Sequence, residues 1–130
     1  MNGLKRAVVD TNVLFMAAYN PEGKAGKIIN FANEGKISLF APDSVKEELL
    51  RVLQRELNFS EDESSFFISR LPVNWVEKQV YLDFIEKTKV KHKADKPVEA
   101  VSLALGCGIL SADNHFAKRI DVNKLIEELS

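Results

Sequence analysis

The sequence is poor in several features that would identify common classes of protein. It holds a single cysteine, Cys107, so no internal disulfide can form and a reducing compartment fits. The two histidines, His92 and His115, lack the spacing of zinc ligands. No Gly-rich phosphate-binding loop is present, so a nucleotide cofactor has no support. The first apolar run covers only residues 7–9, too short for a signal peptide or a membrane span, and we expect a cytoplasmic location.

The sequence also has nearly equal numbers of positive and negative side chains. The 130 residues carry 18 Lys and Arg against 19 Asp and Glu, and this net charge of −1 does not by itself indicate a nucleic-acid-binding protein. The exception is a lysine-rich stretch at residues 87–96, which is either a local basic patch or an ordinary solvated loop. The length and the hydrophobic fraction of 45% predict one globular domain over residues 1–130.

Strand-like and helix-like stretches alternate along the chain. This alternation predicts an α/β fold in which helices cover both faces of a parallel sheet. A capping box at residues 60–63 marks the start of one of the helices. We expect strands at residues 4–9, 37–41, 74–80 and 109–112, and helices at 13–19, 25–33, 43–57, 61–71, 81–87, 95–105 and 122–129.

Two of the expected strands are followed by similar acidic sequences. Asp10 comes directly after the apolar run 7–9, and Asp113 comes after the stretch 109–112. If the strands are neighbours, about 4.8 Å apart, both carboxylates face the crevice at the carboxyl end of the sheet. Two carboxylates that close raise each other's pKa unless a cation lies between them, which favours a divalent metal site. The alternative for Asp10 is a helix cap, because Asp is a favoured N-cap residue.

The helix expected at 95–105 is apolar around most of its circumference and carries one polar stripe. Asp95, Glu99 and Ser102 form this stripe at positions i, i+4 and i+7. Asp95 is either a site residue or the N-cap of its own helix. An N-cap role for Asp95 would still leave Glu99 unexplained, since a carboxylate on a mostly buried helix needs a partner.

The helix expected at 43–57 offers two adjacent glutamates. Ser44 and Glu47 have the spacing of a capping box, which would give Glu47 a local role. Glu48 borders the apolar arc of this helix and has no such role. We therefore predict that Glu48, rather than Glu47, reaches the site.

The order of these motifs resembles the PIN-domain family, including its VapC-like toxin members and short stand-alone prokaryotic PIN proteins. The resemblance covers nearly the whole chain, and it implies a three-layer α/β/α sandwich and Mg²⁺- or Mn²⁺-dependent hydrolysis of RNA. The chain departs from the pattern at Glu99, a position that is usually apolar, and in the short segment after Asp113. The matching motifs are residues 8–14 (VVDTNVL), 48–50 (ELL), 95–97 (DKP) and 110–113 (LSAD).

The resemblance assigns roles to individual residues. Asp10, Glu48, Asp95 and Asp113 stand at the positions of the family's catalytic and metal-binding acids. Carboxylates are hard oxygen ligands that suit Mg²⁺ or Mn²⁺. Around these acids we expect Thr11, Asn12 and Ser111 to orient carboxylates and waters, Glu99 to stand at the site's edge, and Lys91, Lys93, Lys96 and Arg51 to bind RNA.

Two other functions remain open on the sequence. One is a catalytically silent PIN module that binds RNA or a protein partner. The other is a haloacid-dehalogenase-like phosphatase, whose D-x-D pattern would need a second carboxylate where this chain has Asn12. A protein antitoxin is a further expected partner. The apolar residues Phe31, Phe66 and Phe67 would support a homodimer if their helices expose them.

Overall fold

The centre of the molecule is a parallel sheet with the strand order β3-β2-β1-β4-β5. A computed structural model of the chain describes residues 5–112 and 116–130. Because every strand pair is parallel, the strands end at one edge of the sheet, and their last residues lie together there. The strands are β1 (Lys5–Val9), β2 (Ile37–Pro42), β3 (Val73–Val76), β4 (Gly108–Leu110) and β5 (Arg119–Ile120).

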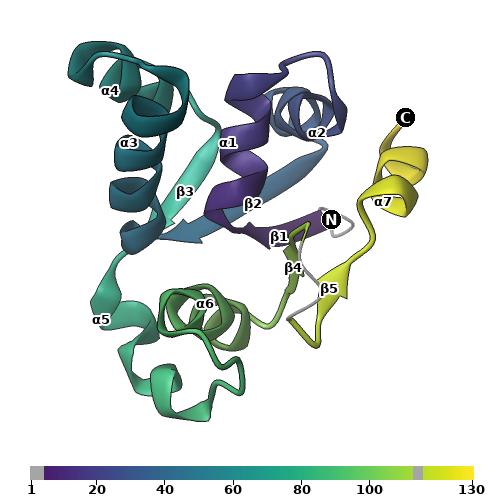
Figure 1. Cartoon of the computed structure of the whole chain (residues 1–130). Helices are drawn as coiled ribbons and strands as arrows, with labels where there is room; N and C mark the ends of the chain where they lie inside the picture. Colours follow the sequence, from purple (N-terminus) through teal and green to yellow (C-terminus); the bar gives the residue numbers. More distant parts are fainter. Residues whose placement is uncertain (1–4, 113–115) are drawn as a thin grey trace.

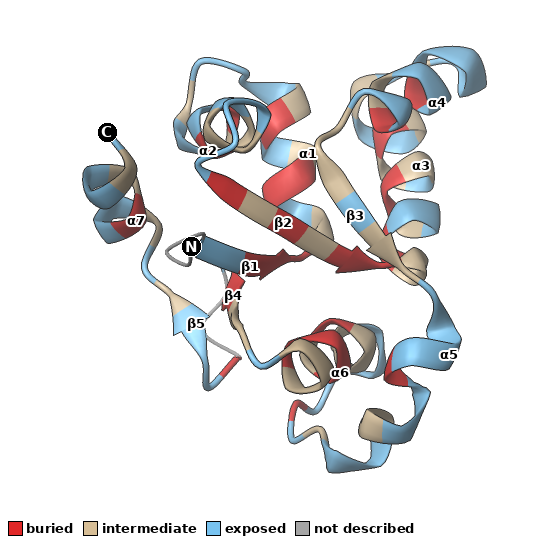
Figure 2. Cartoon of the chain, turned by 180° about the vertical axis from the view of Figure 1, so that it is seen from behind, coloured by how far each residue is buried: buried red, intermediate tan, exposed pale blue. Residues whose placement is uncertain are grey.

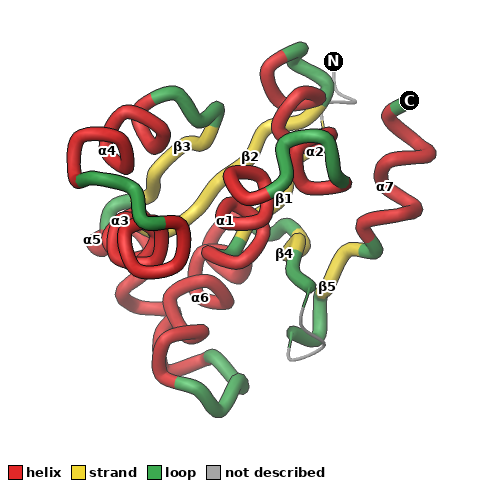
Figure 3. The backbone as a smooth tube through the Cα atoms, turned by 45° about the horizontal axis from the view of Figure 1, so that its top comes forward, coloured by secondary structure: helices red, strands yellow, loops and turns green. Residues whose placement is uncertain are grey.

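Helices cover both faces of this sheet, as Figures 1 and 3 show. One layer contains α1, α2, α3 and α4, and the other contains α5, α6 and the 3-10 helices η1 and η2, while α7 contacts α2 beyond the β5 edge. The predicted α/β/α sandwich is confirmed. The helices are α1 (Thr11–Tyr19), α2 (Lys24–Asn33), α3 (Asp43–Leu57), α4 (Glu61–Ser69), α5 (Lys78–Tyr81), η1 (Leu82–Lys87), η2 (Lys93–Asp95), α6 (Lys96–Leu105) and α7 (Val122–Leu129).

The core lies around β1 and the strands beside it. Ala7, Val8 and Val9 have no exposed surface, because layers of helices cover both faces of a central parallel strand. Figure 2 shows the same concentration of buried residues in β1 and along β2. Asp10 therefore directly follows the buried half of β1, at the carboxyl edge of the sheet. None of the helices in the described ranges is both long and apolar enough to cross a membrane.

Local signals set several of the helix boundaries. The predicted capping box at the start of α4 is present, with reciprocal bonds between Ser60 and Glu63. The capping box predicted for Ser44 and Glu47 is wrong, because α3 already begins at Asp43 after an extended Pro42 and has no side-chain cap. The C-cap of α6, Gly106, has a φ of 67°, a left-handed conformation that glycine adopts without steric cost.

The strand predicted at 74–80 is shorter than expected. The pairing of β3 with β2 ends at Val76, and the chain then turns into α5. This turn brings Tyr81 into the interior, where its side chain is only 2% exposed. The Tyr81 hydroxyl donates a 2.8 Å hydrogen bond to Asp43 Oδ1. Burial, followed by that bond and the nearby negative charge, raises the pKa of Tyr81 to about 12. The part of the predicted strand from Lys78 onward is therefore helical, and it leads to a buried, hydrogen-bonded Tyr81.

Candidate functional site

Asp10 lies where the two central strands end side by side. The adjacency on which the metal-site argument depended is present, since Val9 of β1 pairs with Leu110 of β4; the strand expected at 109–112 spans 108–110. Ser111 Oγ donates a 2.5 Å hydrogen bond to Asp10 Oδ2. The other carboxylate oxygen, Oδ1, accepts a 3.2 Å bond from the backbone N–H of Val13 and so caps α1. Asp10 is therefore both a helix cap and a residue of the sheet edge, and the two interpretations do not exclude each other.

Glu48 approaches the same place from α3. Its Oε1 accepts a 2.6 Å hydrogen bond from Thr11 Oγ1, so the residue after Asp10 holds this second carboxylate in position. Glu48 is half-buried, whereas Glu47 is exposed. The choice between the two glutamates agrees with this geometry, although the capping argument behind the choice was wrong.

Asp95 is the third acid, and it comes from the opposite layer of helices. It ends η2 and precedes α6, but its side chain makes no capping hydrogen bond to that helix. Asp10, Glu48 and Asp95 all line one open cleft of about 390 Å³, together with Thr11 and Asn12. The structure thus brings three of the predicted acids to one cleft from β1, α3 and the start of α6.

The fourth predicted acid, Asp113, lies outside the described residues. Within residues 5–112 and 116–130, no three Asp, Glu, His or Cys side chains are gathered closely enough to hold a metal ion. The donor set of the cleft nevertheless suits Mg²⁺ or Mn²⁺, since it consists of carboxylates supported by hydroxyl donors.

The cleft also contains residues that the sequence reasoning did not place there. Phe15 of α1 and Glu56 of α3 both line it. Glu56 stands eight residues after Glu48, with Val52 between them at four, so helical spacing on one face of α3 was the available signal. Arg55 is on the same wall and pairs with Glu56 across 2.9 Å between Nε and Oε2. Both side chains are exposed, so this pair contributes little to stability.

The polar stripe on α6 does not form one site. Glu99 is not among the residues that line the cleft, and its Oε1 accepts hydrogen bonds from the backbone N–H groups of Lys89 (2.9 Å) and Val90 (3.1 Å). Ser102 Oγ bonds instead to the carbonyl of Cys107, just after the helix. The expectation that Glu99 stands at the edge of the site is therefore corrected: its partner is the preceding loop.

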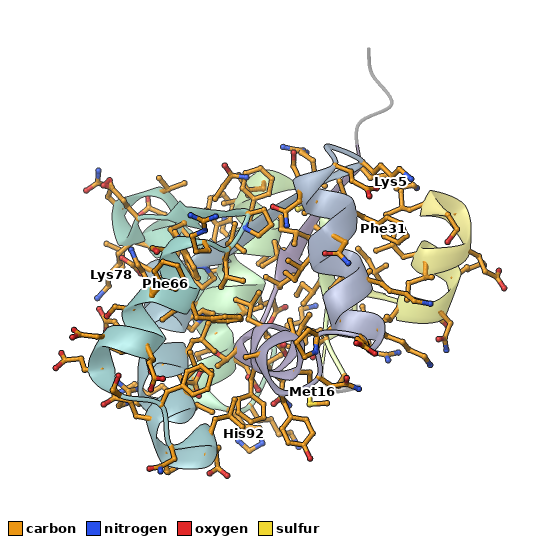
Figure 4. All side chains as sticks on the ribbon, turned by 90° about the horizontal axis from the view of Figure 1, so that it is seen from above. Lys5, Met16, Phe31, Phe66, Lys78 and His92 are labelled. Carbon is orange, nitrogen blue, oxygen red and sulfur yellow. The ribbon has the colours of Figure 1, made fainter. Side chains whose placement is uncertain are left out.

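The predicted RNA-binding residues divide into two groups. Lys91 and Lys93 are exposed in the segment that leads directly to Asp95, and Arg51 is exposed on α3 but does not line the cleft. Lys96 is half-buried, and its Nζ donates a 3.2 Å bond to the carbonyl of Val90. Lys96 and Glu99 thus hold the same peptide segment from its two sides. In Figure 4, His92 of this loop and Met16 of α1 lie at the bottom of the picture, opposite Lys5 at the start of β1.

A parallel sheet between two helical layers, with acids from three elements converging on one cleft at the carboxyl edge, defines the class: an α/β/α protein with an acidic surface site. The sequence profile of the PIN domain matches residues 8–125. The chain belongs to the PIN domain family, as its motifs predicted.

Comparison with solved structures agrees with this fold. This chain superposes with a TM-score of 0.57 on a chain of VapBC2 from Rickettsia felis, in a crystal structure that also contains a DNA fragment from the VapBC2 promoter. The match covers 83% of this chain and 88% of that chain at 9% sequence identity, so it shows a shared fold. No curated protein matches the sequence.

Proposed function

We propose that this protein is a divalent-metal-dependent ribonuclease that hydrolyses RNA phosphodiester bonds. The observation that carries the proposal is the convergence of Asp10, Glu48 and Asp95 on one cleft. Membership of the PIN domain family supports a nuclease of this class. The position of Asp113 in the sequence, shortly after the strand that pairs with β1, makes it the proposed fourth acid.

The proposed metal ligands are Asp10, Glu48, Asp95 and Asp113. A bound Mg²⁺ or Mn²⁺ would supply an activated water and neutralise charge on the scissile phosphate. Ser111 and Thr11 donate hydrogen bonds to Asp10 and Glu48, which fixes the position of one oxygen of each carboxylate. Asn12, exposed at the mouth of the cleft, would orient water or the substrate.

RNA is the proposed substrate, and its approach to an acidic cleft needs cations at the rim. Lys91 and Lys93, exposed in the loop before Asp95, would contact the phosphates on one side. Arg51 would extend the contact along α3, away from the cleft itself. With a net charge of −1 the molecule supplies no strong overall attraction, so the local cations have to provide it.

We further propose a protein antitoxin as a partner, since one structural neighbour is a chain of VapBC2 bound to a fragment of its promoter DNA. This would make the protein the toxin of a toxin-antitoxin pair, acting in the cytoplasm. The homodimer stays a prediction. Of the residues named for it, Phe66 is 66% exposed on α4, with Arg70 stacked on its ring, while Phe31 and Phe67 are partly buried.

Calorimetric titration with Mn²⁺, followed by incubation with single-stranded RNA, tests the proposal. We expect metal binding to the folded protein and cleavage that requires the metal and stops on addition of a chelator. Metal-independent RNA binding without cleavage would instead support the silent PIN module. A trapped phosphoryl group on Asp10 would support the phosphatase, although Asn12 is not the carboxylate that its D-x-D pattern needs.

Glu99→Ala should weaken RNA binding more than it slows the chemical step of cleavage. The substitution removes the acceptor that holds the backbone of Lys89 and Val90, and with it the fixed position of Lys91 and Lys93. We expect the KM for RNA to rise about fivefold, equivalent to about 1 kcal/mol, with a smaller change in kcat. Steady-state kinetics at low salt measures both constants.

Two further variants control this experiment. Glu99→Gln keeps an acceptor oxygen and should restore most of the RNA affinity. Glu86→Ala removes an exposed glutamate from η1 and should leave both constants unchanged. An equal rise in KM for Glu99→Ala and Glu86→Ala would mean that the loop contacts do not position the lysines.

A further inference from the structure

A second groove lies on the other side of Asn12 from the acidic cleft. It has a volume of about 460 Å³ and is enclosed by α1, the start of α2, the end of β4, and the β5–α7 connection. We propose that this groove binds the nucleotide adjacent to the scissile phosphate, with the base in the groove and its phosphate at the groove's rim. The proposal deepens, and rests on, the ribonuclease function proposed above.

The acidic cleft and the groove adjoin each other. Asn12 lines both the acidic cleft and the groove, so they meet at the residue that follows Asp10 and Thr11. Adjacent nucleotides in a single strand are joined through one phosphate. A strand whose phosphate lies at Asp10 would therefore place the next nucleotide over Asn12 and into the groove.

The floor of the groove is apolar. Val13, Ile28 and Leu110 are buried beneath the groove, and Met16 is 42% exposed beside them. A flat base can cover such a surface, and a methionine thioether makes favourable contacts with aromatic rings. Unpaired bases in single-stranded RNA are usually recognised in this way, by contact with one face and hydrogen bonds to the edges.

Polar side chains lie beside this floor. The side-chain amides of Asn12, Asn20 and Asn123 all border the groove, and none makes a hydrogen bond to another residue in the described part of the chain. Amides can donate to and accept from the edges of a base. Small-ligand sites commonly have a few polar groups of this kind beside an apolar lining.

A guanidinium group of the groove is held near Asp10 through Ser111. Arg119 Nε donates a 2.8 Å hydrogen bond to the carbonyl of Ser111, whose hydroxyl donates to Asp10. This contact fixes Arg119 beside the cleft and leaves its terminal nitrogens available for a phosphate. Lys24, exposed on the opposite rim, adds a second cation, and Asp121 of the same lining carries a negative charge. Of these charged residues, Arg119 is the one on the side of Asp10, where the phosphate next to the scissile position would lie.

The test is an NMR titration of the ¹⁵N-labelled protein in metal-free buffer with adenosine 5′-monophosphate or ribose 5-phosphate. We expect the nucleotide to bind more tightly than the sugar phosphate and to shift the amide signals of Asn20, Lys24 and Val122, which border the groove. Equal binding of the two probes would overturn the proposal, as would shifts confined to residues outside the groove.

Two matched variants complete the test. Met16→Glu places a carboxylate in the groove and should weaken nucleotide binding about tenfold through lost contact and charge repulsion. Val80→Glu adds the same charge at a position on α5 that is 50% exposed, and should bind like the wild type. Preserved dispersion of the spectrum verifies folding. Equal nucleotide affinity of the two variants would overturn the proposal. A wild-type dimer that Met16→Glu dissociates would also overturn it, because the groove would then be an interface between two copies of the chain.

The failure of this inference differs from failure of the proposed function. The titration uses no metal and needs no turnover. Nucleotide binding in the groove without any RNA cleavage would therefore rule out only the proposed ribonuclease activity. Metal-dependent cleavage without nucleotide binding in the groove would rule out only the proposed nucleotide-binding role of the groove.

Discussion

Asp10→Asn should abolish metal-dependent RNA cleavage and weaken Mn²⁺ binding while leaving the protein folded. The Asn side chain has the same shape, and its Oδ1 still accepts the bond from the Val13 N–H that caps α1. The lost negative charge removes one of the proposed metal ligands. We expect a fall in kcat of about 10³-fold, equivalent to about 4 kcal/mol of transition-state stabilisation.

Cleavage assays and Mn²⁺ calorimetry measure this effect, and circular dichroism verifies the fold. Asp83→Asn makes the same charge change at an exposed position of η1 and should retain full activity. Asp113→Asn should behave like Asp10→Asn. Undiminished cleavage by both the Asp10 and the Asp113 variants would contradict the ribonuclease proposal.

Gly26→Ala should be among the most damaging single changes to stability. A Cβ atom at this position would lie 1.8 Å from the carbonyl oxygen of Pro21 and 2.5 Å from its carbon. Both atoms belong to the backbone of the α1–α2 turn, so a side-chain rotation cannot relieve the clash. Alanine improves helix propensity by about 1 kcal/mol, which offsets only part of the cost. We expect a net loss of about 3 kcal/mol in the free energy of unfolding.

Urea denaturation of the variant measures this loss, and Gly23→Ala is the comparison. At Gly23 the nearest atom to an added Cβ is the side-chain Nδ2 of Asn20, at 2.9 Å, and this flexible group can move. Gly23→Ala should therefore cost less than Gly26→Ala. Wild-type stability for Gly26→Ala would show that the turn does not pack against α2 as described.

The sequence predicted the features that depend on short-range pattern. The run 7–9 before Asp10 and the apolar segment before Ser111 indicated buried parallel strands, and these are the neighbours β1 and β4. Helical periodicity located α3 and α6, and the composition of α6 predicted its burial. Such signals are visible in sequence because each is a repeat of residue types along a single element.

The features that the sequence did not predict depend on contacts between elements. A helical wheel shows which face Glu99 occupies, but its partners are backbone N–H groups of a loop, which carry no residue-specific signal. The strand expected at 74–80 ends at Val76, and the α5 that follows it packs Tyr81 against Asp43 of another element, a contact that the local pattern does not show. Glu56 was overlooked although its spacing from Glu48 was visible, because only the cleft's other wall makes that face of α3 part of a site.

The edge strands of the sheet influence how the protein can bind other macromolecules. An outer strand normally offers a row of unpaired peptide groups, onto which a strand of another chain can add. Here the outermost strands are short, with only Arg119–Ile120 in β5 and Val73–Val76 in β3. Lys46 also lies over the Trp75 ring beside β3, which places a charge near that margin. Partners are therefore expected to bind to helices and loops through side chains, and extension of the sheet into larger aggregates is disfavoured.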